Sequence, residues 1–463
     1  MTGVATGKTI GTVTIKAAAA VAGGTDVSNQ TTLTVKSHEA SIAITLGEEN
    51  FSVATPAAGY YTSVANAPRT VISDITKVKV NVTPAAHASV KIGSRVFISG
   101  YPLDFTSPVT FTVTAQDGTA KNYTLAIAAY DATANPYGIY TVKHLIDMAG
   151  NDVNNRGARL SFLLKNNIDL PDRTAAEAAA ITGMSDYAAA GWKPLAHNLY
   201  GYGFRGTFDG GNFSINNFYI NRETTDEIGL FAKLETEGTI KNLGINGASG
   251  TAVTGKQGGF FVFYCQGTID KCYAAGNISV DYSGGGLVAY LESGGVISNS
   301  YATGNISGSS ASSNIGGLAG RVNEGAINNS YATGNIVVSY SSAAPSVAAG
   351  GLAGRVNKGT ISNSYATGNV SVPLSSSAGG LAGSSNSANV TYTNCYRNSD
   401  AAIKNNNVDV APNDASIAGI VAKTKDYMQT DAFKADLNGP AGTIWGREDS
   451  RNDKLPYIAG VGR

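Results

Sequence analysis

The chain has 463 residues and a formal net charge of zero, because 33 basic residues balance 33 acidic ones. This balance removes the electrostatic basis for binding nucleic acid or an anionic membrane surface. Charged residues make up 14% of the chain, against about 25% in an average globular domain. Ser, Thr, Asn, Gly and Tyr must therefore cover much of the surface, as is typical of extracellular β-proteins.

The beginning of the chain, MTGVATGKTIGTVTIKAAAAVAGG, has a run of small residues but no leucine-rich signal-peptide core. We therefore expect that an export signal has been removed ahead of residue 1. No apolar run approaches the ~20 residues of a membrane-spanning helix. The cysteines are odd in number and lack metal-binding spacing, so buried thiols are the simplest interpretation of Cys265, Cys272 and Cys395.

Residues 1–131 predict a β-sandwich. Residues 107–129, SPVTFTVTAQDGTAKNYTLAIAA, consist of two alternating strands around the turn QDG. Further short strands separated by turns favour an immunoglobulin-like sandwich. Residues 1–36 are also strand-like, and they either complete this sandwich or are the remnant of a preceding module.

A second domain is expected over 139–463, after a linker at 132–138. Apolar residues recur at helical spacing in TVKHLIDMA, within 137–150, and predict a helix that caps the open strand edge of this domain. A second short helix is expected over 173–191. The segment TKDYMQTDAFKADLN at 424–438 predicts a helical closing segment.

Between these helices the sequence repeats itself. A "GGL" or "GGF" marker is followed by a short β-branched stretch, and GAINNSYATGNI at 325–336 has close copies at 295–306 and 359–370. A tyrosine preceded by Ser or Cys recurs at spacings of 28, 30, 34 and 31 residues, namely Tyr273, Tyr301, Tyr331, Tyr365 and Tyr396. A degenerate copy extends the repeats upstream, so that they cover about 228–400.

Each repeat is too short and too glycine-rich to bury an apolar face alone. Stacked copies can bury one, because identical positions then lie above one another at ~4.8 Å. About 30 residues suit one coil of a three-sided parallel β-solenoid. The Gly-Asn pair of each "ATGN" is expected at a corner where a positive φ favours glycine and tolerates asparagine.

The repeat GGLAGRVNEGAINNSYATGNI resembles the GLUG motif of bacterial surface proteins, which include adhesins and some immunoglobulin-cleaving metallopeptidases. GWKPLA (191–196), FRGTFDGGNFSINNFYI (204–220) and TIWGREDSRNDKLPYI (443–458) are similar to passages that flank this motif. The resemblance covers about 137–463 and implies a scaffold more than an activity. Residues 104–125 are similar to the last strands of cadherin-like or bacterial Ig-like modules.

A catalytic centre is not found. The four histidines include no HExxH pair, so the zinc-peptidase activity of some relatives is not carried over, and no G-x-S-x-G or phosphate loop occurs. Glycan-cleaving β-helices need clustered carboxylates on one face. The acids of 258–400 do not share a repeat column. We therefore expect neither an enzyme nor a metal or other cofactor.

The tyrosine column is the candidate ligand site. Strict alternation from the preceding Ile would place Asn and Tyr inside the solenoid as a core stack. A kink after Asn would instead turn Ser or Cys and Ala inward and Tyr outward. Outward tyrosines would form an aromatic strip suited to sugars.

Repeat length varies at one place only, between "GN[IV]" and the next "GGL". These insertions, at 307–315, 337–349 and 371–378, predict one variable edge of the solenoid. They are rich in Ser, and Tyr340 lies in the longest of them. They are either neutral spacers or a second contact surface for a carbohydrate or protein.

The sequence thus predicts an all-β chain, with an N-terminal β-sandwich followed by a parallel β-solenoid with short helical caps. We expect a monomeric, adhesin-like binding protein at the bacterial cell surface or outside the cell, with a glycan or an extracellular protein as its partner. A glycan-cleaving enzyme and a passive stalk are the alternatives. The predicted ligand-binding residues are Tyr273, Tyr301, Tyr331, Tyr340, Tyr365 and Tyr396.

Overall fold

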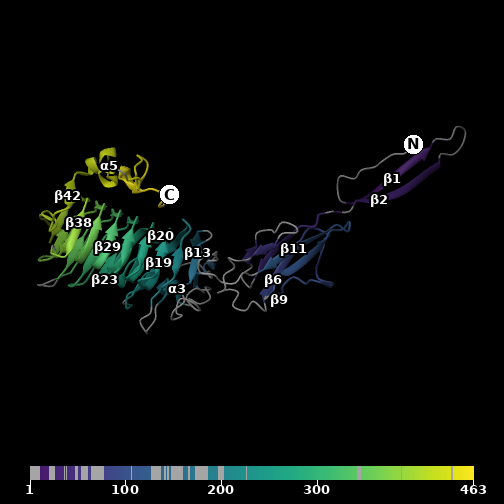
Figure 1. Cartoon of the computed structure of the whole chain (residues 1–463), viewed down its shortest axis with the longest axis horizontal. Helices are drawn as coiled ribbons and strands as arrows, with labels where there is room; N and C mark the ends of the chain where they lie inside the picture. The colour runs from purple at the N-terminus through teal and green to yellow at the C-terminus, as the bar shows by residue number, and fades with distance from the viewer. Residues whose placement is uncertain are drawn as a thin grey trace. The chain divides into compact units, whose positions relative to one another are not determined.

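The computed structural model describes residues 11–19, 27–35, 37, 39–46, 51–53, 61–63, 78–105, 107–126, 137–139, 142, 145–146, 160–164, 167–172, 186–196, 203–225, 227–340, 346–386, 388–439 and 442–462. The chain divides into two compact units, Met1–Asp131 and Ala132–Arg463, and both are drawn in Figure 1.

The N-terminal unit consists of sheets in which most strands pair antiparallel. One sheet has the order β5 (Tyr61–Ser63), β11 (Ala120–Ala126), β10 (Val109–Thr114), β7 (Ser89–Ile92), β8 (Arg95–Val96), with β5 parallel to β11. The other has the order β4 (Phe51–Val53), β3 (Ile42–Leu46), β6 (Val78–Pro84), β9 (Tyr101–Leu103). β1 (Gly11–Ala19) and β2 (Val27–Val35) pair with each other in a separate two-stranded sheet.

The hairpin predicted around QDG is present as β10 and β11. Gly118 has a φ of 94°, which explains the glycine in this turn. Phe111 and Val113 of β10 are buried, in agreement with the alternating sequence. The buried Tyr123 hydroxyl of β11 donates to the Ala40 carbonyl at 2.6 Å, and this bond connects β11 to the segment that leads into β3.

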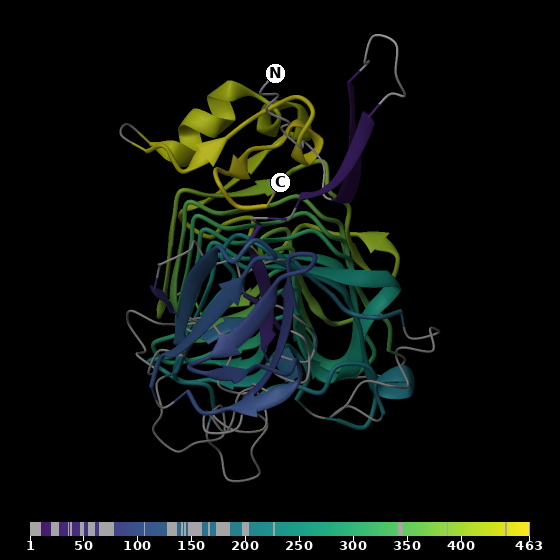
Figure 2. The same cartoon turned by 90° about the vertical axis from the view of Figure 1, so that its right-hand side faces the viewer.

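The second unit is a parallel β-solenoid, which Figure 2 shows end-on as a stack of coils. Its first face is the column β12 (Tyr137–Ile139), β13 (Ser161–Leu164), β15 (Thr207–Asp209), β19 (Thr239–Lys241), β22 (Thr268–Asp270), β25 (Val296–Ser298), the ends of β29 (Ala319–Asn328) and β33 (Ala353–Ser362), and β38 (Val390–Thr393). The tyrosine face follows it along the chain, as the column β14 (Ile168–Asp169), β16 (Ser214–Phe218), β20 (Gly244–Gly258), β23 (Tyr273–Gly285), β26 (Tyr301–Ala302), β30 (Tyr331–Ala332), β34 (Tyr365–Ala366), β39 (Cys395–Asn398) and β42 (Ile420–Lys423).

Three shorter segments complete each coil. The first set is β17 (Ile220–Arg222), later parts of β20 and β23, β27 (Ile306–Gly308), β31 (Ile336–Val338), β35 (Val370–Val372) and β40 (Ile403–Asn405), which pairs with β41 (Val408–Asp409). The second set is the end of β23, β28 (Asn314–Gly316), β32 (Ala348–Gly350) and β36 (Ser377–Gly379). The third set is β18 (Phe231–Leu234), β21 (Val262–Cys265), β24 (Val288–Leu291), the beginnings of β29 and β33, and β37 (Ala382–Ser385).

One coil therefore has five strand segments, more than the three that a simple three-sided coil needs. The coil that begins at Tyr301 consists of β26, β27, β28 and the two halves of β29. Each insertion runs from one strand to the next in its coil: 307–315 from β27 to β28, 337–349 from β31 to β32, and 371–378 from β35 to β36. The strands at which they begin, β27, β31 and β35, stack on one another. The single variable edge is thus confirmed.

Most of the corner glycines are needed for a different reason from the one expected. Gly276 has a positive φ, of 149°, but Gly304, Gly334 and Gly368 do not. Instead, a Cβ added to Gly334 would lie 1.8 Å from the Gly304 carbonyl oxygen, because successive coils touch here backbone to backbone. The asparagine that follows forms a ladder, in which the Asn305 side-chain oxygen accepts a hydrogen bond from the Asn335 backbone at 2.9 Å.

The helix expected within 137–150 lies mostly outside the described residues, although Leu145 and Ile146 are helical and buried. Most of 173–191 also lies outside them, and α3 (Tyr187–Ala190) is its described part. The closing helices are present as α4 (Lys425–Met428) and α5 (Asp431–Asn438), capped by Thr424 and Thr430.

We predict that Gly334→Ala destabilises the solenoid by about 3 kcal/mol, because the added methyl group has to push two coils apart. Urea denaturation followed by circular dichroism measures this effect. The control is Ser312→Ala on an exposed insertion, for which the change should be within about 0.5 kcal/mol. Equal midpoints for both variants would contradict the close packing at this corner.

Candidate functional site

The tyrosine column points outward, because the chain kinks immediately before it. Asn299, Asn329 and Asn363 have φ values of 48°, 48° and 45°, in the left-handed region. This turn breaks the strand alternation, so that the next residue, Ser300 in the first of these coils, is fully buried. Ala302 is buried as well. Of the two orientations that the sequence left open, the kinked one is present.

The rings form a continuous stack along the outside of the solenoid. Tyr273 and Tyr301 are 5.2 Å apart between centroids, Tyr301 and Tyr331 are 4.8 Å apart, and Tyr331 and Tyr365 are 5.0 Å apart. Their planes differ by 10° or less. This spacing equals the separation of neighbouring strands, so each ring is placed by the backbone pairing of its own coil.

The expectation of an exposed aromatic strip is wrong for most of the column. Residues 424–439 and 442–462, which we call the C-terminal strap, turn back over the solenoid (Figures 1 and 2), and their side chains pack on the rings. Trp445 packs on Tyr331 and Tyr365, and Phe433 packs edge-on against Tyr365 and Tyr396. The buried cluster comprises Tyr331, Tyr365, Tyr396, Met428, Phe433, Leu437, Trp445, Leu455, Ile458 and Val461.

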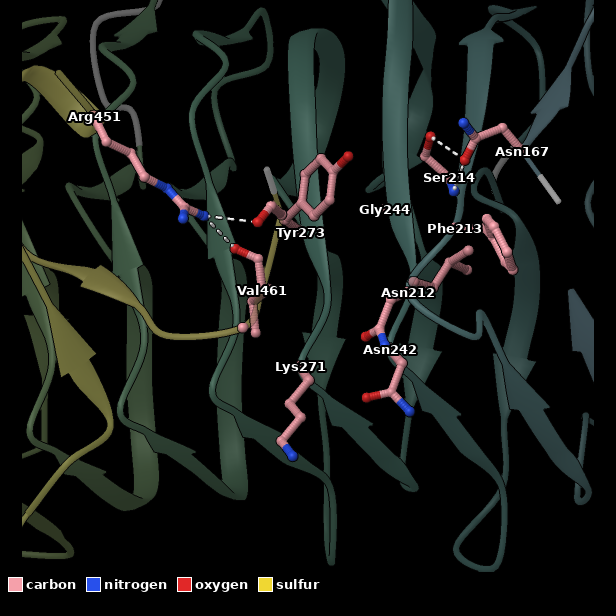
Figure 3. A pocket seen from close by; sticks show the side chains of 13 residues that line it. Asn167, Asn212, Phe213, Ser214, Asn242, Gly244, Lys271, Tyr273, Arg451 and Val461 are labelled. Carbon is pink, nitrogen blue, oxygen red and sulfur yellow. Dashed lines mark hydrogen bonds between the residues drawn. The ribbon is translucent and has the colours of Figure 1, made fainter. Parts of the chain in front are cut away.

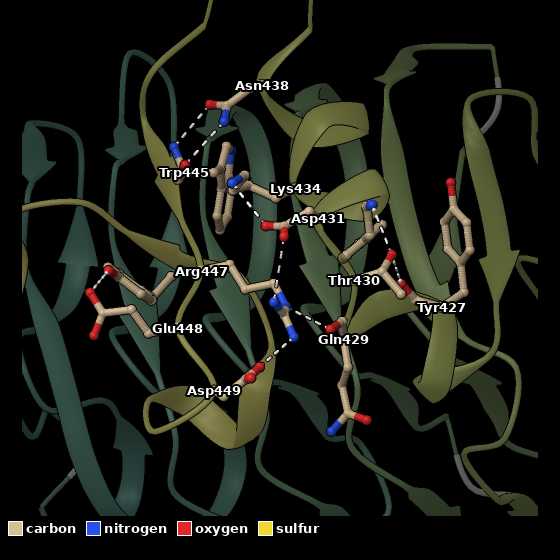
Figure 4. A network of polar contacts seen from close by, with 12 residues as sticks. Tyr427, Gln429, Thr430, Asp431, Lys434, Asn438, Trp445, Arg447, Glu448 and Asp449 are labelled. Carbon is tan, nitrogen blue, oxygen red and sulfur yellow. Dashed lines mark hydrogen bonds and ion pairs between the residues drawn. The ribbon is translucent and has the colours of Figure 1, made fainter.

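Polar contacts give the strap a structure of its own (Figure 4). Asn438 bonds the backbone of Trp445 twice, at 3.0 and 2.9 Å, and thereby joins α5 (Asp431–Asn438) to β43 (Trp445–Gly446). Arg447 donates to the Gln429 carbonyl at 2.6 Å. β43 pairs with β44 (Tyr457–Ile458), and η1 (Asn452–Lys454) lies between them. The Tyr365 hydroxyl donates to the Pro456 carbonyl, which fixes the strap to the column.

Burial beneath the strap changes the acidity of the tyrosines. It raises the pKa of Tyr331 and Tyr365 well above the usual value for a phenol, and the neighbouring Tyr365 and Tyr301 hydroxyls contribute further to the rise at Tyr331. Burial also raises the pKa of Tyr301 to about 12. These tyrosines therefore stay neutral over the physiological range.

The column of rings ends at Tyr273. The positions that stack below it are occupied by Gly244 and then by Ser214. The Tyr273 ring lies over Gly244, where a Cβ would come within 2.3 Å of the ring atoms, and among the described residues no further aromatic ring continues the stack. A pocket of about 440 Å³ lies here, between these coils and the end of the strap (Figure 3).

This pocket combines an aromatic group with polar groups. Tyr273 and Phe213 supply the rings, and Asn167, Asn212 and Asn242 supply amides. The side chain of Asn212 has no hydrogen-bond partner among the described residues, and Asn242 uses its amide nitrogen to donate to Asp209 at 3.0 Å. Lys271 and Arg451 also line the pocket. An aromatic group beside amide side chains, of which that of Asn212 is available for a ligand, is an arrangement that can bind the apolar face and the hydroxyls of a sugar.

The predicted site residues therefore fall in three places. Tyr331, Tyr365 and Tyr396 are buried beneath the strap, Tyr301 and Tyr273 are half-buried at its end, and Tyr340 lies exposed on the insertion edge. The structure brings only Tyr273 into the pocket. The sequence analysis missed Asn212, Gly244 and Lys271. Two of these could have been found, because Gly244 and Lys271 depart from Tyr and Asn in their repeat columns.

The carboxylates of the repeat region are engaged in separate pairs and do not converge. Glu292 is buried and accepts hydrogen bonds from Arg321 and Asn323. Asp270 accepts from Ser298 and Asn299. Among the residues that the structure describes, no group of three or more His, Cys, Asp or Glu could hold a metal ion.

None of the described helices combines the length and the apolar character needed to cross a membrane. All three cysteines are buried, free thiols, and burial raises the pKa of Cys265 and Cys395 to about 12.

Two family models match parts of the chain. The model described as SGBP, N-terminal, the N-terminal domain of surface glycan-binding proteins, matches residues 70–127. The model described as the GLUG motif matches residues 281–307 and 346–371. The chain thus contains GLUG motifs in its solenoid and an SGBP-type module in its N-terminal unit.

Two sequence relatives share part of the chain. Halomucin of Haloquadratum walsbyi is 28% identical over 226 residues, which are 47% of this chain and 2% of that protein. A protein of Evansella cellulosilytica, provisionally named a Gly-rich membrane protein, is 32% identical over 113 residues, 24% of this chain and 11% of that one. The chain therefore spans only a small part of either relative.

Among solved structures, a chain from Bacteroides ovatus provisionally named an immunoglobulin A1 protease is similar, with a TM-score of 0.55 and 22% identity. The similarity covers 71% of this chain and 93% of that one. At this level of identity it shows the fold alone.

We predict that Trp445→Ala releases the strap, because removing a buried indole from a core costs about 3–5 kcal/mol. Limited trypsin digestion followed by mass spectrometry should then show cleavage at Lys434 and Arg447 while the coils stay intact. The control is Ile444→Ala, whose side chain is 38% exposed. Equal cleavage of both variants would contradict the role assigned to the indole.

We also predict that the stability of the solenoid falls at alkaline pH. The raised pKa of Tyr331 and Tyr365 means that the folded state favours the neutral phenol. The resulting stabilisation is complete below about pH 10, the ordinary pKa of tyrosine, and is lost as the pH rises further. Urea unfolding at about pH 8 and about pH 11 measures the loss. The Tyr331→Phe variant should lose less stability over the same interval, and an equal loss would contradict the assignment.

Proposed function

We propose that this chain is a non-catalytic, glycan-binding part of a protein displayed on the bacterial surface, and that its solenoid binds a sugar in the pocket beside Tyr273. The observation that carries the proposal is the end of the tyrosine stack at Gly244, where Tyr273, the last ring of the stack, lines a pocket together with amide side chains. Sugars pack their apolar faces on aromatic rings and bond amides through their hydroxyls.

Two further findings support this proposal. The match of residues 70–127 to the N-terminal domain of surface glycan-binding proteins associates the chain with that class of ligand. The GLUG motif and a surface low in charge are consistent with a location at the cell surface or outside the cell. The pocket volume of about 440 Å³ lies within the range of about 300–1,000 Å³ for small-molecule sites.

The alternative of an enzyme has less support. The carboxylates of the described repeat region form separate contacts with Arg321, Ser298 and Lys358, and they do not come together as the carboxylate pair of a glycan-cleaving site would. The similar fold from Bacteroides ovatus bears the name of a protease, which makes cleavage of immunoglobulin A1 the activity to test.

A glycan array probed with the full chain tests the proposal. We expect binding to a defined set of glycans, and we expect Tyr273→Ala to weaken it about tenfold, as for the loss of one aromatic contact of about 1.5 kcal/mol. Tyr340→Ala is the matched control, because Tyr340 is exposed on the insertion edge. Its affinity should equal that of the parent.

Three results would overturn the proposal. Silence of the parent chain on every glycan would favour a passive stalk. Loss of binding in Tyr340→Ala alone would place the site on the insertion edge. Release of reducing sugar, or cleavage of immunoglobulin A1, would show an enzyme.

A further inference from the structure

A corner of the solenoid next to the pocket carries one residue that does not fit its column. The corner connects the first face to the tyrosine face, and in six successive coils its backbone is left-handed. The φ values are 51°, 53°, 48°, 48°, 45° and 55° for Asn242, Lys271, Asn299, Asn329, Asn363 and Asn394. Asparagine is enriched in this conformation, whereas lysine is not. Lysine is therefore a less favourable residue than asparagine for the left-handed backbone at position 271.

The lysine also interrupts a ladder that the asparagines form. The amide nitrogen of Asn394 donates to the side-chain oxygen of Asn363 at 3.0 Å, and Asn363 donates to Asn329 in the same way at 3.2 Å. The amide of Asn299 cannot continue the ladder, because lysine has no acceptor, and it bonds Asp270 at 2.7 Å instead. Stability thus does not account for a lysine at this position.

Of the six residues in this column, Lys271 and Asn242 line the pocket. It is exposed and has no ion-pair partner in the part of the chain that the structure describes. The nearby acids are engaged, since Asp209 contacts Lys241 at 3.4 Å and Asp270 bonds Asn299.

The lining of the pocket is positively charged. It contains Lys271 and Arg451 but no carboxylate. Arg451 donates to the carbonyls of Val461 and Gly462 at 2.8 Å, so its charge is held in place by the strap. Figure 3 shows Arg451 to the upper left of Tyr273 and Lys271 below it, with the ammonium group of Lys271 pointing away from the ring. Its flexible stem lets the ammonium group follow a ligand that projects from the pocket.

We propose that Lys271 is a specificity-determining residue, which makes the pocket select a sugar that carries a negative charge. This inference rests on the proposed function, because it assigns a ligand class to the same pocket. The charge can come from a carboxylate, as in a uronic acid, or from a sulfate ester. Both groups accept hydrogen bonds from an ammonium ion, so the structure assigns the shared chemistry, an anionic sugar residue.

The test compares Lys271→Asn with the parent chain. The substitution restores the asparagine of the column, so the variant should fold and should be at least as stable as the parent in urea. Its affinity for glucuronate-containing oligosaccharides should fall about three- to tenfold, as for a partly exposed charge pair. Affinity for the matching glucose oligosaccharides should stay the same. Sulfated oligosaccharides form a third arm that separates the two sources of charge.

Two further variants complete the design. Lys271→Arg keeps the charge and should keep the preference for anionic ligands. Lys404→Asn removes one charge from β40 (Ile403–Asn405), which lies in a later coil and does not line the pocket, and should leave all affinities unchanged. An equal loss in Lys404→Asn would indicate a general charge effect and overturn the inference.

The outcomes separate this inference from the proposed function. If the parent binds neutral and anionic sugars equally and Lys271→Asn does the same, only the charge selection is wrong. If Tyr273→Ala and the parent bind equally well, or if the parent binds neither class, the pocket itself is not the site.

Discussion

The backbone hydrogen bonds between coils hold equivalent residues of neighbouring coils ~4.8 Å apart, and this distance constrains every side chain of the solenoid. Where a column keeps the same residue type, this spacing produces ladders of isoleucine, serine, asparagine and tyrosine. The Ser300 backbone donates to the Ser330 hydroxyl at 3.2 Å, and the Ser330 backbone donates to Ser364 at 3.1 Å, so even the buried polar column is satisfied by repetition. Repetition therefore replaces the irregular packing of an ordinary core.

The same constraint explains what the sequence could predict. The hairpin around Gly118, the stacked repeats and the position of the insertion edge follow from local patterns, and the structure contains all three. The sequence left open whether the tyrosines point inward or outward. Strict alternation does not show that a left-handed Asn299 turns them outward, but the small residue that follows the asparagine in each repeat is a hint of it.

The strap could not be predicted from such patterns. Trp445 meets Tyr331 and Tyr365, which lie far away in the sequence, and neither the column nor the helices of 424–438 specify this pairing. The pocket depends on the same long-range contact, because the end of the strap forms one of its walls. The only local signals of the pocket are the departures from the repeat at Gly244 and Lys271. In a chain whose stability rests on repetition, a departure such as Lys271, which breaks the ladder of its own column, is a sensible place to look for function.

The strap has one more consequence, which concerns how such a chain can change in length. Solenoids grow and shrink by gaining or losing whole coils, since each new coil finds its template in the last one. Here the strap runs from Phe433 on Tyr396 to Gly462 beside Tyr301, so it is matched to a set number of rings. A coil added within that interval would shift Trp445 and Pro456 away from their tyrosines. The length of the strap thus fixes the number of coils between Tyr301 and Tyr396, and we expect duplication of coils to be tolerated only outside that interval.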